Sequence, residues 1–410
     1  MRNYNKFIYQ FKAFSVNFSS KIAKDLGRVE TKFISSMIYG VIKSQSTKLS
    51  DIARALKESI SLKDTVDRLS RNLENIYKFL PTIWNNHHDS LKPRIKAGTY
   101  IHLDPSDVIK EYGKKFEDLC RVADGSDDHK VKNGYWVIEI TALVNDRVVS
   151  LYSSIFSTLT KGFLSVNDEI FKALDIIYKS FGNLTTIVID RGFDDEKFFK
   201  YFAQKSWDFI IRVKHTNRIV SWNGTKIKID ELSSKFKGKY NIKIKLKGKF
   251  YDAKCSFAKI LVPGITKELT VIFVYYDKSV SMFITNKDIL GKGTCLNIVY
   301  QYYKRWRIEE FIRCKKEQFN FEDYRVRSLN KMNSLNVLLT LAISSLELLA
   351  CNKTKLLNAI LIEAKSIKSK VFFEYYRIAM GIKEILGHTV TGIATFFRSE
   401  TSQQLAFEFD

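Results

Sequence analysis

The sequence has few residues of the kinds that bind structural zinc or form disulfides. Its five cysteines are scattered with no C-x-x-C pair, and its six histidines form no H-x3-H or H-E-x-x-H group. The cysteines therefore indicate reduced thiols in a cytoplasmic protein and argue against a zinc ribbon. A catalytic metal would have to be held by carboxylates, a ligand set that favours Mg²⁺ or Mn²⁺.

Long hydrophobic runs are also lacking. The N-terminal segment MRNYNKFIYQFKAF contains no apolar region of a secretory signal. The longest apolar stretch, Leu335–Leu349, is interrupted by Thr340, Ser344, Ser345 and Glu347. This stretch is predicted to be too short and too polar to span a membrane, so we interpret it as a buried packing helix and expect no membrane partner.

Positive charge is what the sequence has in excess. The 410 residues include 67 Lys and Arg against 44 Asp and Glu, a net charge of +23. Such an excess implies a polyanionic partner, either nucleic acid or an anionic membrane surface. An apolar content of 45% over this length indicates a globular protein of two or three domains.

Residues 1–95 have the pattern of helices. Two short amphipathic segments, Leu49–Leu56 and Leu62–Leu73, form a helix-turn-helix candidate, with Ser50 as the predicted cap of the first. Many helical hairpins share this pattern, so a purely structural hairpin is an open alternative. In a DNA-binding motif, the phosphate contacts would come from Lys48, Arg54, Lys63, Arg68 and Arg71.

After residue 95 the pattern changes to strands rich in β-branched and aromatic residues. Three strands are predicted first, the last two joined by a turn at Asn145-Asp146-Arg147, and a helix-strand-helix-strand series follows. This is the element order of an RNase H-like α/β domain, although other α/β folds share parts of it. The predicted ranges are strands Thr99–Leu103, Tyr135–Leu143 and Val148–Phe156, helix Val166–Ser180, strand Thr185–Ile189, helix Asp195–Lys205 and strand Asp208–Val213.

From about His215 to Asn286 alternating strands replace the helices, and helices resume near Leu296. The predicted organisation is therefore a helical DNA-binding region at 1–95, an RNase H-like core at 96–214, a β-rich insertion at 215–290, the second part of the core at 291–350, and a helical C-terminal region at 351–410.

Two aspartates directly follow predicted strands. Asp104 comes after TYIHL and Asp190 after TTIVI. Open α/β sheets place ligand sites at the carboxyl ends of their strands, so both are candidate metal ligands. An aspartate in such a position is also a common turn or cap residue, and Asp107 is the alternative to Asp104.

Residues 302–316, YYKRWRIEEFIRCKK, contain Tyr302, Arg305, Glu309 and Lys316. On a helix with about 100° per residue, these four side chains fall within a sector of roughly 60°. The stripe makes a poor core face but a suitable wall for binding a metal and phosphates. The alternative is a solvated face with ion pairs such as Arg305–Glu309. Glu310, the other glutamate, would point about 100° away.

This stripe resembles the Tyr-Arg-Glu-Lys signature of DDE insertion-sequence transposases of the cut-and-paste branch. The segment IVIDRGFD around Asp190 resembles the second-aspartate motif of that family, in which Arg191 and Asp194 support the site, although Asp194 is also a candidate helix cap. Asp104 matches the first aspartate, and the family carries a β-rich insertion at the same place.

The resemblance implies a DNA transposase in which Asp104, Asp190 and Glu309 hold two Mg²⁺ ions, with Mn²⁺ as a substitute. It implies that the enzyme cleaves the element's ends in double-stranded DNA and joins them to a target through a hairpin intermediate, as a dimer, near the nucleoid of a prokaryotic host.

DNA-contacting residues are also implied by position. The resemblance assigns end contacts to Tyr302, Arg305 and Lys316. Some members of the family stack a flipped base on a tryptophan, but the matching strand here reads SMFITN, where Phe283 or Met282 is the available substitute.

A lysine ladder occurs in the β-rich segment. Lys243, Lys245, Lys247 and Lys249 alternate with Ile244, Leu246 and Gly248, which in a strand places the lysines on one face. Such a face would follow a DNA backbone, or it would protect an edge strand from aggregation.

Two further functions stay open at this point. The chain is alternatively a non-catalytic DNA-binding relative of a transposase, or a metal-dependent DNA nuclease without strand transfer.

Overall fold

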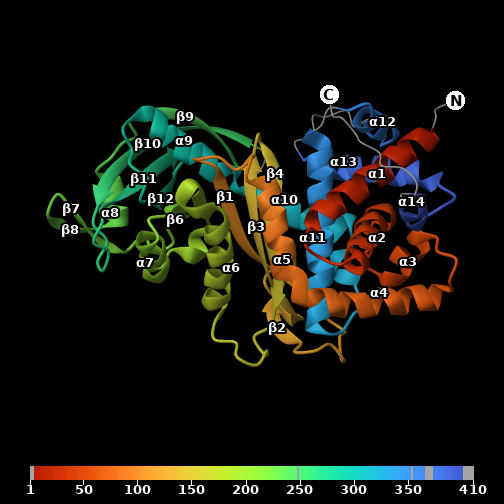
Figure 1. The fold of residues 1–410 in the computed structure, drawn as a ribbon. Helices are drawn as coiled ribbons and strands as arrows, with labels where there is room; N and C mark the ends of the chain where they lie inside the picture. Colours follow the sequence, from red (N-terminus) through yellow and green to blue (C-terminus); the bar gives the residue numbers. More distant parts are fainter. Residues whose placement is uncertain (1–3, 247–248, 352–353, 365–372, 400–410) are drawn as a thin grey trace.

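A large mixed β-sheet forms the centre of the molecule (Figure 1). The computed structural model describes residues 4–246, 249–351, 354–364 and 373–399. The strands of the main sheet lie in the order β2-β3-β1-β5-β6-β12-β11-β10-β9, and β4 also pairs with β3. Their bounds are β1 Tyr100–Ile109, β2 Cys120–Ala123, β3 Val131–Val144, β4 Arg147–Phe156, β5 Thr186–Ile189, β6 Asp208–Arg212, β9 Tyr240–Leu246, β10 Lys249–Ile260, β11 Leu269–Tyr276 and β12 Ser279–Thr285.

The first half of this sheet has the predicted RNase H-like order. Strands β1, β3 and β4 are antiparallel, and a two-residue turn at Asn145 and Asp146, with φ of 50° and 60°, joins the last two. Helix α6 (Val166–Phe181) then leads to β5, and α7 (Glu196–Gln204) leads to β6, with both strands in parallel pairing. The predicted fold class, an α/β RNase H-like domain with a β-rich insertion, is therefore confirmed.

The β-rich segment extends the core sheet, because β12 pairs antiparallel with β6. A separate hairpin of β7 (Ile219–Trp222) and β8 (Thr225–Lys228) precedes it, followed by the short helix α8 (Ile229–Ser234). The expectation that no helix occurs between 215 and 286 was therefore wrong at α8. Strand β9 is the last in the sheet order, so it forms an edge.

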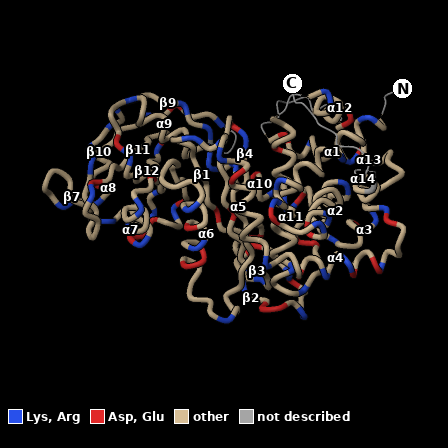
Figure 2. Tube along the Cα trace, in the orientation of Figure 1, with Lys and Arg blue, Asp and Glu red and all other residues tan. Residues whose placement is uncertain are grey.

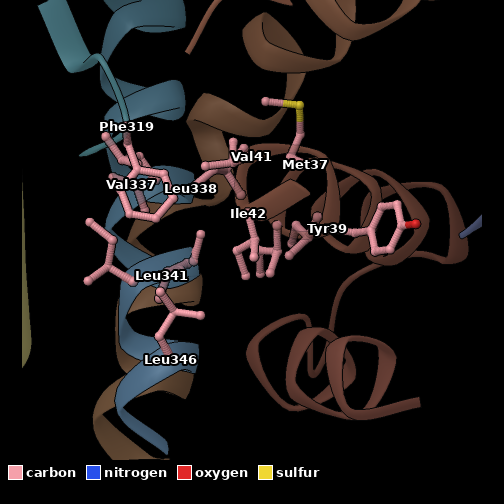
Figure 3. Close-up of a cluster of buried hydrophobic side chains, with 14 of the residues drawn as sticks. Met37, Tyr39, Val41, Ile42, Phe319, Val337, Leu338, Leu341 and Leu346 are labelled. Carbon is pink, nitrogen blue, oxygen red and sulfur yellow. The ribbon is translucent and has the colours of Figure 1, made fainter. Parts of the chain in front are cut away.

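The helices from both ends of the chain pack into one helical body beside the sheet (Figure 1). Their shared core includes Val41 and Ile42 from α2 and Leu338 and Leu341 from α11, which belong to the cluster of buried side chains in Figure 3. The two helical regions predicted at opposite ends of the sequence thus lie together. The bounds are α1 Tyr4–Ile22, α2 Arg28–Ser44, α3 Leu49–Leu56, α4 Leu62–Ile76, α5 Leu80–Leu91, α11 Leu329–Cys351, α12 Lys355–Glu363, α13 Tyr375–Gly387 and α14 Ala394–Ser399.

Helix α11 corrects one expectation and confirms another. It has 23 residues and is long and apolar enough to cross a membrane by length and composition, so the stretch is not too short as predicted. However, 89% of the most apolar 18-residue stretch of this helix is buried inside the structure. It is a packing helix between the sheet and the helical body, as expected from its interrupted apolar run.

The predicted helix-turn-helix segments are present as α3 and α4. Ser50 does not cap the first helix, whose N-cap is Lys48, whereas the Ser61 hydroxyl accepts the Asp64 amide at 3.1 Å and caps the second. Several of the basic residues have acidic partners: Arg68 binds Glu58, Lys48 pairs with Asp323, and Arg54 pairs with Asp51. Their contact with DNA stays a prediction.

Candidate active site

The two candidate aspartates lie level with each other on neighbouring strands. Strands β1 and β5 pair in parallel up to His102 opposite Val188, so two residues further on Asp104 and Asp190 reach the same height and face. Asp104 lies inside β1, and not after a strand end as predicted, because β3 continues to pair with β1 as far as Ile109. Pro105 is tolerated there because β5 has ended on the other side.

The segment carrying the predicted stripe is not one regular α-helix. It runs through α9 (Lys292–Tyr303), a 3₁₀ turn (Lys304–Trp306), α10 (Arg307–Arg313) and a π-helical turn (Cys314–Gln318). This segment crosses the sheet face that carries the aspartates, as the contacts below show.

Three members of the stripe contact the two aspartates or each other. The Tyr302 hydroxyl donates to Asp190 Oδ1 at 3.0 Å. Arg305 Nη1 donates to Asp104 Oδ2 at 3.4 Å, and its Nη2 donates to Glu309 Oε1 at 2.7 Å. Residues about 200 positions apart in sequence are thus gathered in one place.

The gathered charges perturb each other strongly. Burial raises the pKa of Asp104 to about 7; Arg305 opposes this shift, and the neighbouring Glu309 and Asp190 add to it. Burial alone would lower the pKa of Arg305, but Asp104, Tyr302, Asp190 and Glu309 together raise it. Burial, with Asp190, also raises the pKa of the Tyr302 phenol. The site therefore holds crowded carboxylates that require a positive charge among them.

A divalent cation suits this donor set. Within the described parts of the chain, no three His, Cys, Asp or Glu side chains already surround a common point. Instead, the guanidinium of Arg305 lies between Asp104 and Glu309 where a cation would bind. Three carboxylates provide only oxygen donors, which hard cations such as Mg²⁺ prefer. Asp104, Asp190 and Glu309 fit such an ion if Arg305 moves aside.

Lys316, the fourth member of the stripe, lies beside different partners. Its ammonium donates to Asp107 Oδ2 at 2.6 Å and pairs with Glu322 at 3.3 Å. The other Asp107 oxygen accepts the Gly125 amide at 3.2 Å. Asp107 is thus the anchor of Lys316 and has no contact with the Asp104 group among the hydrogen bonds of the structure. Replacing Asp107 would therefore disturb Lys316, so an Asp107 variant is not a neutral control for substitutions of the candidate metal ligands.

Glu310 and Asp194 have separate surroundings. Glu310 lines a small cavity with Arg307 and Tyr375, away from the aspartates, as expected. Asp194 is buried, accepts the amides of Lys214 and His215 at 2.7 and 2.9 Å, and pairs with Arg218 at 2.6 Å. The helix cap is Asp195, so the cap interpretation of Asp194 was wrong. Arg191 is exposed beside Asp190.

The lysine ladder is partly present. Lys243 and Lys245 are exposed on β9 between the buried Ile242 and Ile244, as predicted. Lys247 lies outside the described residues, and Lys249 begins β10, so the predicted single strand is a hairpin. The buried isoleucines join the cluster under α9, which places the two lysines on the opposite sheet face. Figure 2 shows further lysine and arginine residues distributed over both the sheet and the helical body.

Neither substitute for the base-stacking tryptophan is exposed. Phe283 is fully buried, with its ring centroid 4.3 Å from that of Tyr302, and Met282 is 7% exposed. Phe283 therefore supports Tyr302 from below and does not offer a ring to a base.

Several polar residues on the same sheet face were not predicted from the sequence. His102 is buried two residues before Asp104, and burial, with Arg305 and Arg307, lowers its pKa to about 3. Glu139 and Lys315 form a fully buried ion pair nearby. The available signal for Glu139 was a charged residue inside the apolar strand YWVIEITAL. The helical period placed Lys315 outside the stripe, but no feature of the sequence showed that it is buried against Glu139.

Comparison with known proteins bears on the function. Residues 159–344, less than half of the chain, match a family model described as "Transposase DDE domain". This segment includes Asp190 and the stripe from Tyr302 to Lys316, whereas Asp104 lies before it. No match was found among curated proteins.

Among solved structures, the chain is similar to a piggyBac transposase synaptic complex with hairpin DNA. The identity is 10% over 96% of this chain and 80% of that chain, with a TM-score of 0.47. The domain match, on an RNase H-like fold, supports a DNA transposase function. DDE transposases generally use divalent metal ions.

Proposed function

We propose that the chain cleaves transposon ends and joins them to target DNA, with Asp104, Asp190 and Glu309 as the ligands of two Mg²⁺ ions and Mn²⁺ as a substitute. The observation that carries this proposal is the contact set of Tyr302 with Asp190 and of Arg305 with Asp104 and Glu309. A plain ion-pair stripe on a solvated helix would not meet two aspartates from the middle of a sheet.

Bound divalent ions would activate the attacking water or 3′-hydroxyl and stabilise the leaving oxygen. The chain's own residues hold the geometry. The Tyr302 hydroxyl orients Asp190, and its ring packs on the buried Phe283. Arg305 and Lys316 are cations that cannot ligate a metal, so their role is to hold phosphates near the scissile bond.

Double-stranded DNA is the proposed partner. The net charge of +23 and the exposed lysines of β9 supply the sequence-independent attraction. From the family resemblance, we further propose a homodimer that joins two ends in one complex, a hairpin intermediate, and action at the nucleoid of a prokaryotic cell. The edge position of β9 equally favours a protective role for its lysines.

The triad is tested by cleavage of DNA that carries the proposed transposon ends. Asp104→Ala, Asp190→Ala and Glu309→Ala should each abolish cleavage and leave end binding largely intact, because these groups hold metal and not DNA. The matched control is Glu310→Gln, a neighbouring glutamate on the same helix that faces a different cavity. A triad variant that cuts at nearly the wild-type rate in Mg²⁺ would remove that residue from the site.

A strand-transfer assay distinguishes the remaining functions. Pre-cut ends with a free 3′-hydroxyl should be joined to a supercoiled target plasmid in a metal-dependent reaction. Nicking without joining would identify a nuclease, and end binding without either reaction would identify a non-catalytic relative.

A further inference from the structure

A row of four polar side chains crosses the sheet beneath α10. In the strand register, Asp104 on β1 is opposite Glu139 on β3, and Glu139 is opposite Ser153 on β4. Directly opposed residues point to the same face of a sheet. Since Asp190 lies level with Asp104 on the other side, the row runs Asp190, Asp104, Glu139, Ser153 over four strands.

The segment 302–315 crosses this row and meets it residue by residue. Tyr302 bonds to Asp190, and Arg305 to Asp104. Beyond them, the Lys315 ammonium donates to Glu139 Oε1 and lies 3.1 Å from Ser153 Oγ. The catalytic candidates occupy two of these meeting points. The third is an ion pair that the proposed chemistry does not use.

This third meeting point is sealed from solvent, and the Lys315 ammonium has four acceptors, whereas the second Glu139 oxygen, Oε2, has no hydrogen-bond partner among the described residues. The side chains of Lys315 and Glu139 are 1% and 2% exposed. Two residues of α11 complete the network, with Asn336 Oδ1 at 2.6 Å and Thr340 Oγ1 at 3.1 Å from the ammonium. The network therefore joins the π-helical turn that follows α10 to β3, β4 and α11 at a single point.

Stability alone is a poor explanation for such a pair. Desolvation of two charges offsets most of their attraction, and well-packed apolar residues of similar size often stabilise a protein as well or better. A buried ion pair is better explained where it selects one specific arrangement of the chain segments that it joins. Here the anchored segment is a π-helical turn, Cys314–Gln318, whose backbone bonding is less regular than that of an α-helix.

We propose that Lys315 and Glu139 are positioning residues of the metal site. The pair fixes where α10 crosses the sheet, and so holds Glu309 within reach of Asp104 and Asp190. Neither residue touches DNA or metal, because both are enclosed by the network. The inference rests on the proposed function for what the site does, but its test does not depend on cleavage alone.

The test removes both charges together, so that neither is left buried without a partner. The double variant Lys315→Met/Glu139→Met should fold with a melting temperature close to that of the wild type. Its Mn²⁺ affinity, measured by electron paramagnetic resonance without DNA, should fall about 10- to 100-fold, the usual effect of losing support around a metal ligand. Single-turnover cleavage should fall similarly, while end-binding affinity should stay within about twofold.

An ion pair away from the row supplies the control, with a buried Glu347 and a half-buried Arg94 whose side chain is 22% exposed. Arg94 binds Glu347 of α11 with 2.8 and 2.5 Å bonds, and neither residue contacts the row. The double variant Arg94→Met/Glu347→Met should retain wild-type Mn²⁺ affinity. If both double variants lose Mn²⁺ affinity equally, the effect is general loosening and the inference is overturned. If the first retains wild-type Mn²⁺ affinity, the pair is merely structural.

A single substitution keeps the test decisive if the double variant does not fold. Glu139→Gln preserves shape and hydrogen bonding but removes the charge, and should lower Mn²⁺ affinity several-fold; an unchanged affinity would overturn the inference. A wild-type protein that binds Mn²⁺ but cleaves no DNA would contradict the proposed function and leave the positioning test in force. A wild-type protein that binds no Mn²⁺ would overturn both.

Discussion

Replacement of Arg305 tests the candidate site most directly. Its guanidinium is 12% exposed and donates to carboxylates on both sides. A hydrogen bond to a charged group contributes about 1.5–3 kcal/mol, or roughly 10- to 100-fold in affinity. Before the guanidinium can bind a phosphate, it must give up its hydrogen bonds to Asp104 and Glu309, and this cost offsets part of the gain. Arg305→Ala should therefore weaken end binding by only about 10-fold. Cleavage should fall further, by about 10²–10³, because charge develops there in the transition state.

Two companion variants make the result specific. Arg305→Lys should restore activity only in part, because lysine lacks the planar fork of donors. Glu309→Gln should lose cleavage with little loss of binding. End-binding affinity and single-turnover cleavage are measured for all three proteins, with circular dichroism to verify the fold. If Arg305→Ala bound and cut normally in a folded protein, the stripe would be an ordinary ion-pair face and the site argument would fail.

Three further predictions concern salt, stability and metal. Replacing the ladder lysines Lys243, Lys245, Lys247 and Lys249 by Gln should reduce the slope of log affinity against log salt concentration by up to about 0.9 per lost phosphate contact. An unchanged slope would mean that these lysines protect the edge strand and do not bind DNA. Asp194→Ala removes the acidic partner of Arg218, whose side chain is 15% exposed, and the acceptor of two backbone amides. It should lower the free energy of unfolding in urea by about 3 kcal/mol, whereas loss of the helix cap in Asp195→Ala should cost about 1 kcal/mol; equal effects would contradict a structural role for the buried Asp194. EDTA should abolish cleavage but not end binding, and Mg²⁺ or Mn²⁺ should restore it; cleavage that persists in EDTA would exclude the metal triad.

Local patterns predicted the strands and helices of the core well, but not how far the sheet extends. The alternation of β10 to β12 was visible in sequence, whereas the pairing of β12 with β6 depends on residues more than 70 positions apart. The first strand was predicted to end at Leu103, and the DPSD that follows it contains Asp, Pro and Ser, which favour turns. Pairing with β3 overrides this local preference and keeps Asp104 inside the strand.

For the candidate site, residue type and spacing predicted the right neighbours where each side chain had a chemical signature. Tyr302, Arg305 and Glu309 could be grouped by helical period, and Asp190 by the strand before it. Adjacent Lys315 and Lys316 are alike in sequence, and only the tertiary structure shows that one is buried against Glu139 and the other meets Asp107. Burial of a charge depends on the partner, which no local pattern specifies.

The joint helical body has a consequence for how the chain folds during synthesis. Lys12 donates to the Thr391 carbonyl at 2.8 Å, and α2 packs against α11 and α13. The apolar faces that α11 and α13 cover on the first helices therefore stay exposed until these two helices have been synthesised. Such long-range contacts slow folding, and exposed apolar surface in the waiting chain promotes aggregation. A chain truncated after α10 would lack α11 and α13, so its N-terminal helices would leave apolar faces uncovered and would tend to aggregate.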